Sequence, residues 1–157
     1  MIGAASVGAY YHGFEPAQKT YFGLLKLGDF LKSFENGFDY KIENIPFEDS
    51  DIARMYDIAL TSPPYYDTEI YSQEQTNSCN RYSTFDDWIS KFYYPMIEKT
   101  IGVSTCFVIN VGSRGYDLKS KLLQLYPETK EIKSKLSGGG GLGREATGKE
   151  SFYLVKK

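Results

Sequence analysis

A segment of apolar residues ends abruptly in Thr-Ser-Pro-Pro-Tyr at positions 61–65, and these residue types can carry out chemistry. Pro63 and Pro64 fix φ and lack an N–H, so they leave a sheet and hold a rigid, extended turn. The Ser62 hydroxyl and the carbonyls beside it then lie at the carboxyl end of a strand, where open α/β sheets bind ligands. Tyr65 adds a flat ring for stacking, and the group suits the binding of a planar amine. The alternative is a strand that the prolines terminate, with no site.

The pentapeptide resembles the catalytic motif of the S-adenosylmethionine-dependent DNA amino-methyltransferases, in which Asp, Asn or Ser precedes two prolines and an aromatic residue. Flanking segments match in order over nearly the whole chain. The resemblance implies a catalytic group made of Ser62, Pro63, Pro64 and Tyr65. The Ser62 side chain and the Pro63 carbonyl accept from the exocyclic amine of adenine (N6) or cytosine (N4), and Tyr65 stacks on the base. The base must leave the duplex to reach such a pocket.

The resemblance also implies a binding site for the methyl donor. The family places an acidic residue at the end of its second strand, where a carboxylate accepts from both ribose hydroxyls, and Glu15 matches it. Phe47 is expected to pack on the adenine of the donor, and Glu48 or Asp49 to accept from its amino group. Thr61 joins this donor-binding set. The alternatives are an acidic residue that opens a helix for Glu15 and an ordinary turn for the three later residues.

The polar segment 67–82 shows little periodicity, and we expect a long loop that covers the flipped base. Tyr66 and Asp67 at its beginning and Asn80 and Arg81 at its end are the predicted substrate-binding residues. Arg81 and Arg144 are expected to contact phosphate or to position the base; a simple surface arginine is the alternative for each.

Composition and charge limit the classes of function. The chain has 157 residues, of which 41% are hydrophobic, enough for one domain with a real core. It has no apolar run near 20 residues, so we expect no membrane span, and a cytoplasmic protein of prokaryotic or phage-like kind. Cys79 and Cys106 lack metal-ligand spacing and there is one histidine, so we expect reduced thiols and no metal site.

Charge is distributed unevenly along the chain. Residues 1–113 carry 8 basic and 15 acidic side chains, whereas residues 114–157 carry 10 and 5. A basic C-terminal third is suited to a phosphate backbone, and DNA is the predicted partner. The alternative is a solvated lysine-bearing surface.

Alternating strands and helices predict an α/β fold with a mostly parallel sheet and a C-terminal antiparallel hairpin, in one domain over 1–157. By resemblance the fold is Rossmann-like. We expect a helix capped by Ser83 and kinked at Pro95, and a strand ending at Asn110 and Val111 that is covered on both sides. Strands are expected at 9–14, 40–45, 56–60 and 105–111, helices at 18–34, 85–97 and 118–125, and the hairpin at 129–136 and 152–156.

The family's first strand and its glycine-rich donor loop have no counterpart, because residues 1–8 resemble only the helix after that loop. In the family this strand lies between the strand that ends at Glu15 and the one that ends at Thr61. We therefore expect a fragment, a split enzyme completed by a second chain or a homodimer, or a degenerate remnant, and favour the first two. S-adenosylmethionine is the expected cofactor, bound weakly or not at all by this chain alone. Alternatives are a non-catalytic DNA-binding module, or methylation of RNA or a protein amide.

Overall fold

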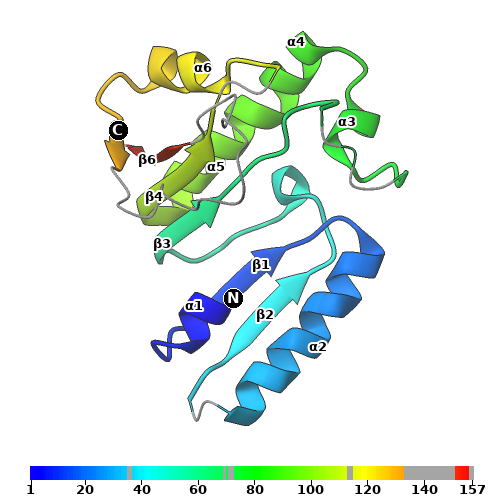
Figure 1. Ribbon diagram of the computed structural model, residues 1–157, viewed down its shortest axis with the longest axis vertical. Helices are drawn as coiled ribbons and strands as arrows, with labels where there is room; N and C mark the ends of the chain where they lie inside the picture. Colours follow the sequence, from blue (N-terminus) through cyan, green and yellow to red (C-terminus); the bar gives the residue numbers. More distant parts are fainter. Residues whose placement is uncertain (35–36, 69, 71–72, 113–114, 133–150, 156–157) are drawn as a thin grey trace, which may run out of the picture. The chain divides into compact units, whose positions relative to one another are not determined.

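The computed structural model describes residues 1–34, 37–68, 70, 73–112, 115–132 and 151–155. The chain divides into two compact units (Figure 1). Unit 1 comprises Met1–Asp51 and Ile70–Ser83, and unit 2 comprises Ile52–Glu69 and Thr84–Lys157. The secondary structure is mixed α/β, with both parallel and antiparallel strand pairs.

Unit 1 is built on a parallel pair of strands joined by a helix. Strand β1 pairs with β2 in parallel, with Tyr11 opposite Tyr40, and α2 connects them (Figure 1). Such a connection is what a parallel pair requires, because a tight turn cannot join its ends. The elements of unit 1 are α1 (Ile2–Ala5), β1 (Tyr11–Phe14), α2 (Gln18–Phe34), β2 (Tyr40–Glu43), the 3₁₀ helix η1 (Phe47–Asp49) and α3 (Ser78–Arg81).

Helix α2 lies against β2 at a single close approach. Gly28 is buried there, and a Cβ at this position would overlap the ring of Tyr40. The Tyr40 hydroxyl donates to the Leu25 carbonyl at 3.0 Å and to Asp29 Oδ1 at 2.7 Å. Burial and then the bond to Asp29 raise the pKa of Tyr40 to about 12. The absence of a side chain at Gly28 lets the helix approach the strand, and the Tyr40 hydroxyl bonds the strand to the helix.

Unit 2 holds a four-stranded sheet of order β3-β4-β6-β5. Strands β3 and β4 are parallel, and β6 runs antiparallel to both of its neighbours. The elements are β3 (Tyr56–Thr61), α4 (Phe85–Trp88), the π-helical turn η2 (Ile89–Tyr93), α5 (Tyr94–Val103), β4 (Ser104–Val111), α6 (Leu118–Leu125), β5 (Lys130–Ile132) and β6 (Ser151–Val155).

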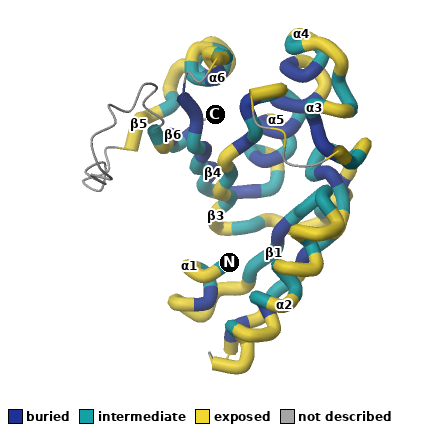
Figure 2. Tube along the Cα trace, turned by 45° about the vertical axis from the view of Figure 1, so that its right-hand side comes forward, coloured by how far each residue is buried: buried dark blue, intermediate teal, exposed yellow. Residues whose placement is uncertain are grey.

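Burial differs between the two faces of this sheet, and β4 carries both buried and partly exposed residues (Figure 2). Alternate side chains of β4 are completely or almost completely buried, and α5 packs on this strand. The opposite face carries Ile58 and Leu60, which are each 68% exposed. On β4 itself, Cys106, Val108 and Asn110 on this face are partly exposed, so the expectation that the strand ending at Val111 is covered on both sides is met only in part. The buried hydrophobic residues of this unit are Tyr65, Trp88, Ile89, Phe92, Tyr93, Met96, Ile97, Phe107, Ile109, Val111, Leu118, Leu122, Tyr153 and Val155.

Most predicted elements are present, and three details differ. The helix at 85 is capped by Thr84, not Ser83, because the Thr84 hydroxyl accepts from the Asp87 N–H at 3.1 Å. The irregularity expected at Pro95 lies earlier, in η2, while Pro95 occupies the first turn of α5, where its missing N–H costs nothing. The segment 67–82 is not all loop, because it contains α3.

Candidate functional site

The Thr-Ser-Pro-Pro-Tyr segment lies where the sequence placed it, directly after β3. Thr61 is the last residue of β3 and its Cα partner on the parallel strand β4 is Ile109. Ser62 is exposed at this carboxyl end, whereas Pro63 is buried. The Ser62 hydroxyl is thus presented to solvent on a backbone that two prolines restrict. This is the geometry that a hydrogen-bond acceptor for an incoming amine needs.

Tyr65 is enclosed in this structure, with 2% of its surface exposed. It lies among buried aromatic residues, and the neighbouring Tyr93 hydroxyl donates to the Leu118 carbonyl at 3.0 Å. Burial raises the pKa of Tyr93, which therefore stays neutral. For Tyr65 to stack on a base, its ring must first become accessible, so that role stays a prediction.

Tyr66 has the left-handed backbone conformation, with φ of 49°. A non-glycine residue there carries strain of order 1–3 kcal/mol and persists where packing holds it. Three aromatic rings pack around Tyr66. Its ring centroid lies 5.6 Å from that of Tyr116, 5.9 Å from that of Phe85 and 6.1 Å from that of Trp88. Phe85 and Tyr116 stack at 4.2 Å. The turn after the two prolines is therefore held in one shape.

Asp67 is bound within unit 2. The Tyr116 hydroxyl donates to Asp67 Oδ1 at 2.8 Å, and this bond is the main reason that the pKa of Tyr116 is raised. The contact joins the segment after the prolines to the segment before α6. Sequence reasoning missed Tyr116, although an aromatic residue after a buried strand that ends in Asn110 and Val111 was a usable signal.

In unit 1, Glu15 follows β1 and has the role of a helix-opening residue. Its Oε1 atom accepts from the Ala17 N–H at 2.8 Å, and its own N–H donates to the Glu43 carbonyl at 3.0 Å. Burial raises the pKa of Glu15, which the bond from Ala17 opposes. The carboxylate retains acceptor capacity, since two oxygens offer about four lone-pair positions. Its role toward a donor ribose stays a prediction.

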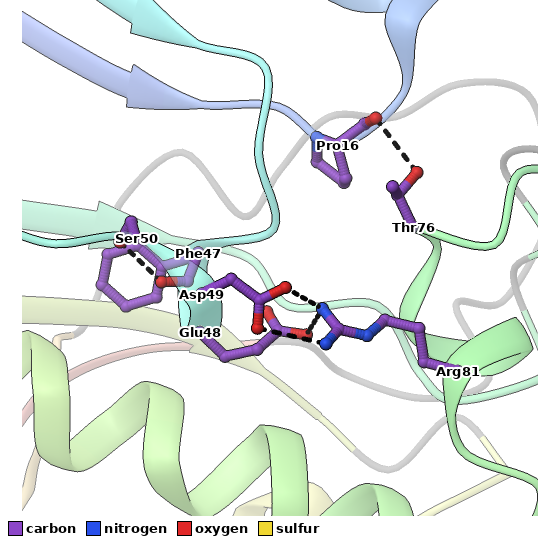
Figure 3. A network of polar contacts seen from close by, with 7 residues as sticks. All are labelled: Pro16, Phe47, Glu48, Asp49, Ser50, Thr76 and Arg81. Carbon is purple, nitrogen blue, oxygen red and sulfur yellow. Dashed lines mark hydrogen bonds and ion pairs between the residues drawn. The ribbon is translucent and has the colours of Figure 1, made fainter.

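The acidic pair on η1 binds an arginine from α3 (Figure 3). Arg81 Nη1 donates to Glu48 Oε1 at 3.0 Å and to Asp49 Oδ2 at 2.8 Å, and Nη2 donates to Asp49 Oδ1 at 3.1 Å. The Glu48 side chain is only 8% exposed. Two residues predicted for the donor and one predicted for phosphate are thus brought together in an ion-pair network that sequence reasoning did not foresee.

This network fixes the second segment of unit 1. The Thr76 hydroxyl donates to the Pro16 carbonyl at 3.1 Å (Figure 3), and Asn80 Nδ2 donates to the Glu74 carbonyl at 2.8 Å. The bond to Asp49 is the main reason that the pKa of Arg81 is raised. In this state Arg81 binds carboxylates of its own chain rather than phosphate, and Asn80 stabilises the local turn.

Phe47 lies on the same 3₁₀ helix, and its ring packs edge-on against Phe14 at 5.2 Å. The Phe47 carbonyl accepts from the Ser50 hydroxyl at 2.6 Å, which closes the turn (Figure 3). Arg144 lies outside the described residues. Phe47 is therefore positioned by packing, as a ring-binding residue must be.

No group of three or more His, Cys, Asp or Glu side chains in the part of the chain that the structure describes has the arrangement of a metal site. Within the same part, none of the helices has the length and apolar character needed to span a membrane. Cys79 and Cys106 form no disulfide with each other.

No family model, curated protein or solved structure matches the chain. We therefore infer function from the geometry within each of the two units and from the motif at 61–65.

Proposed function

We propose that this chain is part of an S-adenosylmethionine-dependent methyltransferase that modifies the exocyclic amino group of a DNA base, N4 of cytosine or N6 of adenine. The observation that carries the proposal is the position of Ser62. It is exposed, it is followed by two prolines, and it lies at the carboxyl end of β3 beside the parallel strand β4. Open α/β sheets bind ligands at this edge.

The strand orders support a Rossmann-like methyltransferase fold that lacks its first strand. Unit 1 has the parallel pair β2-β1, and unit 2 has β3-β4-β6-β5 with an antiparallel end. The absent strand of the resemblance belongs between the strand before Glu15 and the strand before Ser62. Each sheet ends at one of those two strands, so we propose that upstream sequence, a second chain or a second copy completes the fold.

The chemistry follows from the acceptors at the motif. The lone pair of an aromatic amine is delocalised into the ring, which makes the nitrogen a poor nucleophile. Hydrogen bonds from its two N–H groups to the Ser62 hydroxyl and the Pro63 carbonyl favour a pyramidal nitrogen. The N–C bond then forms as the methyl group leaves sulfur. Because a serine hydroxyl is a weaker acceptor than a carboxylate, the proton departs to solvent after transfer.

When bound, S-adenosylmethionine supplies the electrophilic methyl group. The described residues of unit 1 fit part of this donor: Glu15 retains acceptor capacity for ribose hydroxyls, and Phe47 offers a packed ring for adenine. Glu48 or Asp49 would accept from the adenine amino group, and Thr61 of unit 2 belongs to the same predicted set. A glycine-rich donor loop is not matched in the sequence, so we propose that donor binding by this chain alone is weak or absent.

A non-catalytic DNA-binding or interaction remnant is the second candidate. The Arg81 network favours the loss of catalysis, because Glu48 and Asp49, the residues predicted for the donor adenine, are bound to Arg81 in this structure. Methylation of RNA or of a protein amide is a third possibility within the same chemistry. Ser62 in place of asparagine argues against the amide.

Methyl transfer from radiolabelled S-adenosylmethionine to oligonucleotides separates these candidates. The protein used is this chain joined to a strand and glycine loop from a family member. We expect transfer to DNA, reduced about 10- to 100-fold by Ser62→Ala, because one transition-state hydrogen bond is lost. Ser33→Ala on the exposed side of α2 is the matched control and is expected to change nothing. DNA binding that persists without any methyl transfer would instead support the non-catalytic DNA-binding remnant.

A further inference from the structure

Asn110 lies one residue beyond the last residue pair of β3 and β4, at the carboxyl edge of the unit 2 sheet, as Ser62 does. Ser62 directly follows Thr61, and Asn110 directly follows Ile109, which is the Cα partner of Thr61 on the parallel strand. On its other side, Asn110 is paired with Phe152 of the antiparallel strand β6. The Ser62 hydroxyl just after β3, the Asn110 amide on β4 and the Phe152 ring on β6 therefore belong to the same edge of the sheet.

The Asn110 side chain is not part of the buried core. Its neighbours Ile109 and Val111 are fully buried, and alternation along β4 places Asn110 on the opposite face. Phe152, beside it, is 39% exposed. The amide therefore lies beside a partly accessible aromatic ring.

The oxygen of the Asn110 amide lacks a hydrogen-bond partner among the described residues. Asn110 Oδ1 is buried, and within the described residues it accepts no hydrogen bond. Buried polar atoms are nearly always paired, so an exception next to a candidate site points to a function. Nδ2, the other polar atom of this amide, is not among the buried unpaired atoms of the described residues, and its NH₂ group is a hydrogen-bond donor.

The proposed amine site needs a hydrogen-bond donor in addition to its acceptors. Ser62 and the Pro63 carbonyl accept from the amine, but adenine and cytosine both carry an unprotonated ring nitrogen next to that amine. Guanine and thymine carry an N–H at the corresponding position. A donor at this point therefore selects the two bases that the proposed chemistry uses, and an amide NH₂ group is such a donor.

We propose that Asn110 is the specificity residue of the target-base site: its Nδ2 group donates to N3 of cytosine or N1 of adenine while the motif holds the neighbouring amine. The ring of Phe152 flanks the base on β6. This inference rests on the proposed function, and it adds a residue and a discrimination that the motif alone does not provide.

Nuclear magnetic resonance of the ¹⁵N-labelled chain tests the proposal without methyl transfer. The Asn110 side-chain NH₂ signals are assigned by their loss in Asn110→Asp. We expect them to move saturably with deoxycytidine or deoxyadenosine monophosphate, and to stay in place with the thymidine and deoxyguanosine nucleotides. The nucleotide that shifts the Asn110 signals at the lower concentration identifies the target base. The exposed Gln124 amide on α6 is the internal control.

Analogues that lack the ring nitrogen, 3-deazacytosine and 1-deazaadenine, sharpen the test. They should still move the backbone amides of Ser62 and Tyr65 but not the Asn110 signals. Asn110→Asp keeps an acceptor and loses the donor, so it should weaken nucleotide binding about tenfold. Movement of Ser62 and Tyr65 with an unmoved Asn110 would overturn the inference and leave the proposed function standing. No movement at any of the three would overturn both.

Discussion

Arg81→Gln removes the positive charge from the acidic pair on η1 and is expected to loosen α3. The wild-type guanidinium makes three contacts of 3.1 Å or less with Glu48 and Asp49. A hydrogen bond to a charged group contributes about 1.5–3 kcal/mol. The Asp49 side chain is 45% exposed, so solvent screens most of its interaction with Arg81. The Glu48 side chain is only 8% exposed, so without Arg81 its charge would be poorly hydrated. The expected net loss is about 2 kcal/mol.

Amide hydrogen exchange in α3 measures this loss locally. The N–H groups of Asn80 and Arg81 both donate to the Asn77 carbonyl, at 2.9 and 3.1 Å, so they report on the helix itself. A loss of about 2 kcal/mol corresponds to exchange that is about 30-fold faster. Arg81→Lys should show an intermediate increase, because a lysine is a point charge and cannot form the bidentate pair.

Arg54→Gln is the matched control for this experiment. Arg54 is exposed in unit 2 and its guanidinium lies 5.1 Å from the Tyr56 ring. Its loss should leave exchange in α3 unchanged. The reasoning would be refuted if Arg81→Gln and Arg54→Gln gave the same rates as the unchanged chain, since the network would then not hold α3.

Three further predictions concern backbone, charge and the turn after the prolines. Gly28→Ala should lower the free energy of urea unfolding of unit 1 by about 2 kcal/mol, because the new methyl group overlaps the Tyr40 ring. Gly23→Ala, in open space on α2, should raise it by about 0.5–1 kcal/mol. Equal effects of the two changes would contradict the close packing of Gly28 on Tyr40. The pKa of Glu15 is raised in the folded state, so its contribution to stability is fully present below the ordinary glutamate pKa of 4.5 and is lost as pH rises through the folded-state pKa. Glu15→Gln should remove that decline from a pH series of unfolding curves, and an unchanged slope would refute the assignment. Tyr116→Phe should speed amide exchange at the turn after Tyr65 without lowering global stability, and unchanged exchange would show that its hydroxyl does not hold the turn.

Local rules in the sequence were enough for several elements. Helix α2 was predicted with its observed bounds, Gln18–Phe34, because apolar spacing and the break after it agree. The hairpin of β5 and β6 was also predicted, and its strands pair antiparallel. The cap of α4 was predicted at Ser83 and lies at Thr84, because both hydroxyls satisfy a three-residue spacing and only the chain geometry selects between them.

The site was predicted in part for a similar reason. Ser62 lies at a strand end because two prolines cannot continue the sheet, which is a local effect. The pairing of Arg81 with Asp49 joins residues 32 apart, and no spacing rule reaches that far. The left-handed conformation of Tyr66 was equally beyond prediction, because packing by Tyr116 and Phe85, which follow later in the chain, holds it.

Nucleoside mass spectrometry tests directly whether Ser62 helps to methylate an exocyclic amine. DNA is taken from cells that express the chain joined to a strand and glycine loop from a family member, and is digested to nucleosides. The account predicts N4-methylcytosine or N6-methyladenine, strongly reduced with Ser62→Ala and unchanged with Ser33→Ala. Methylation at a ring carbon, or equal amounts of product with Ser62→Ala, would contradict it.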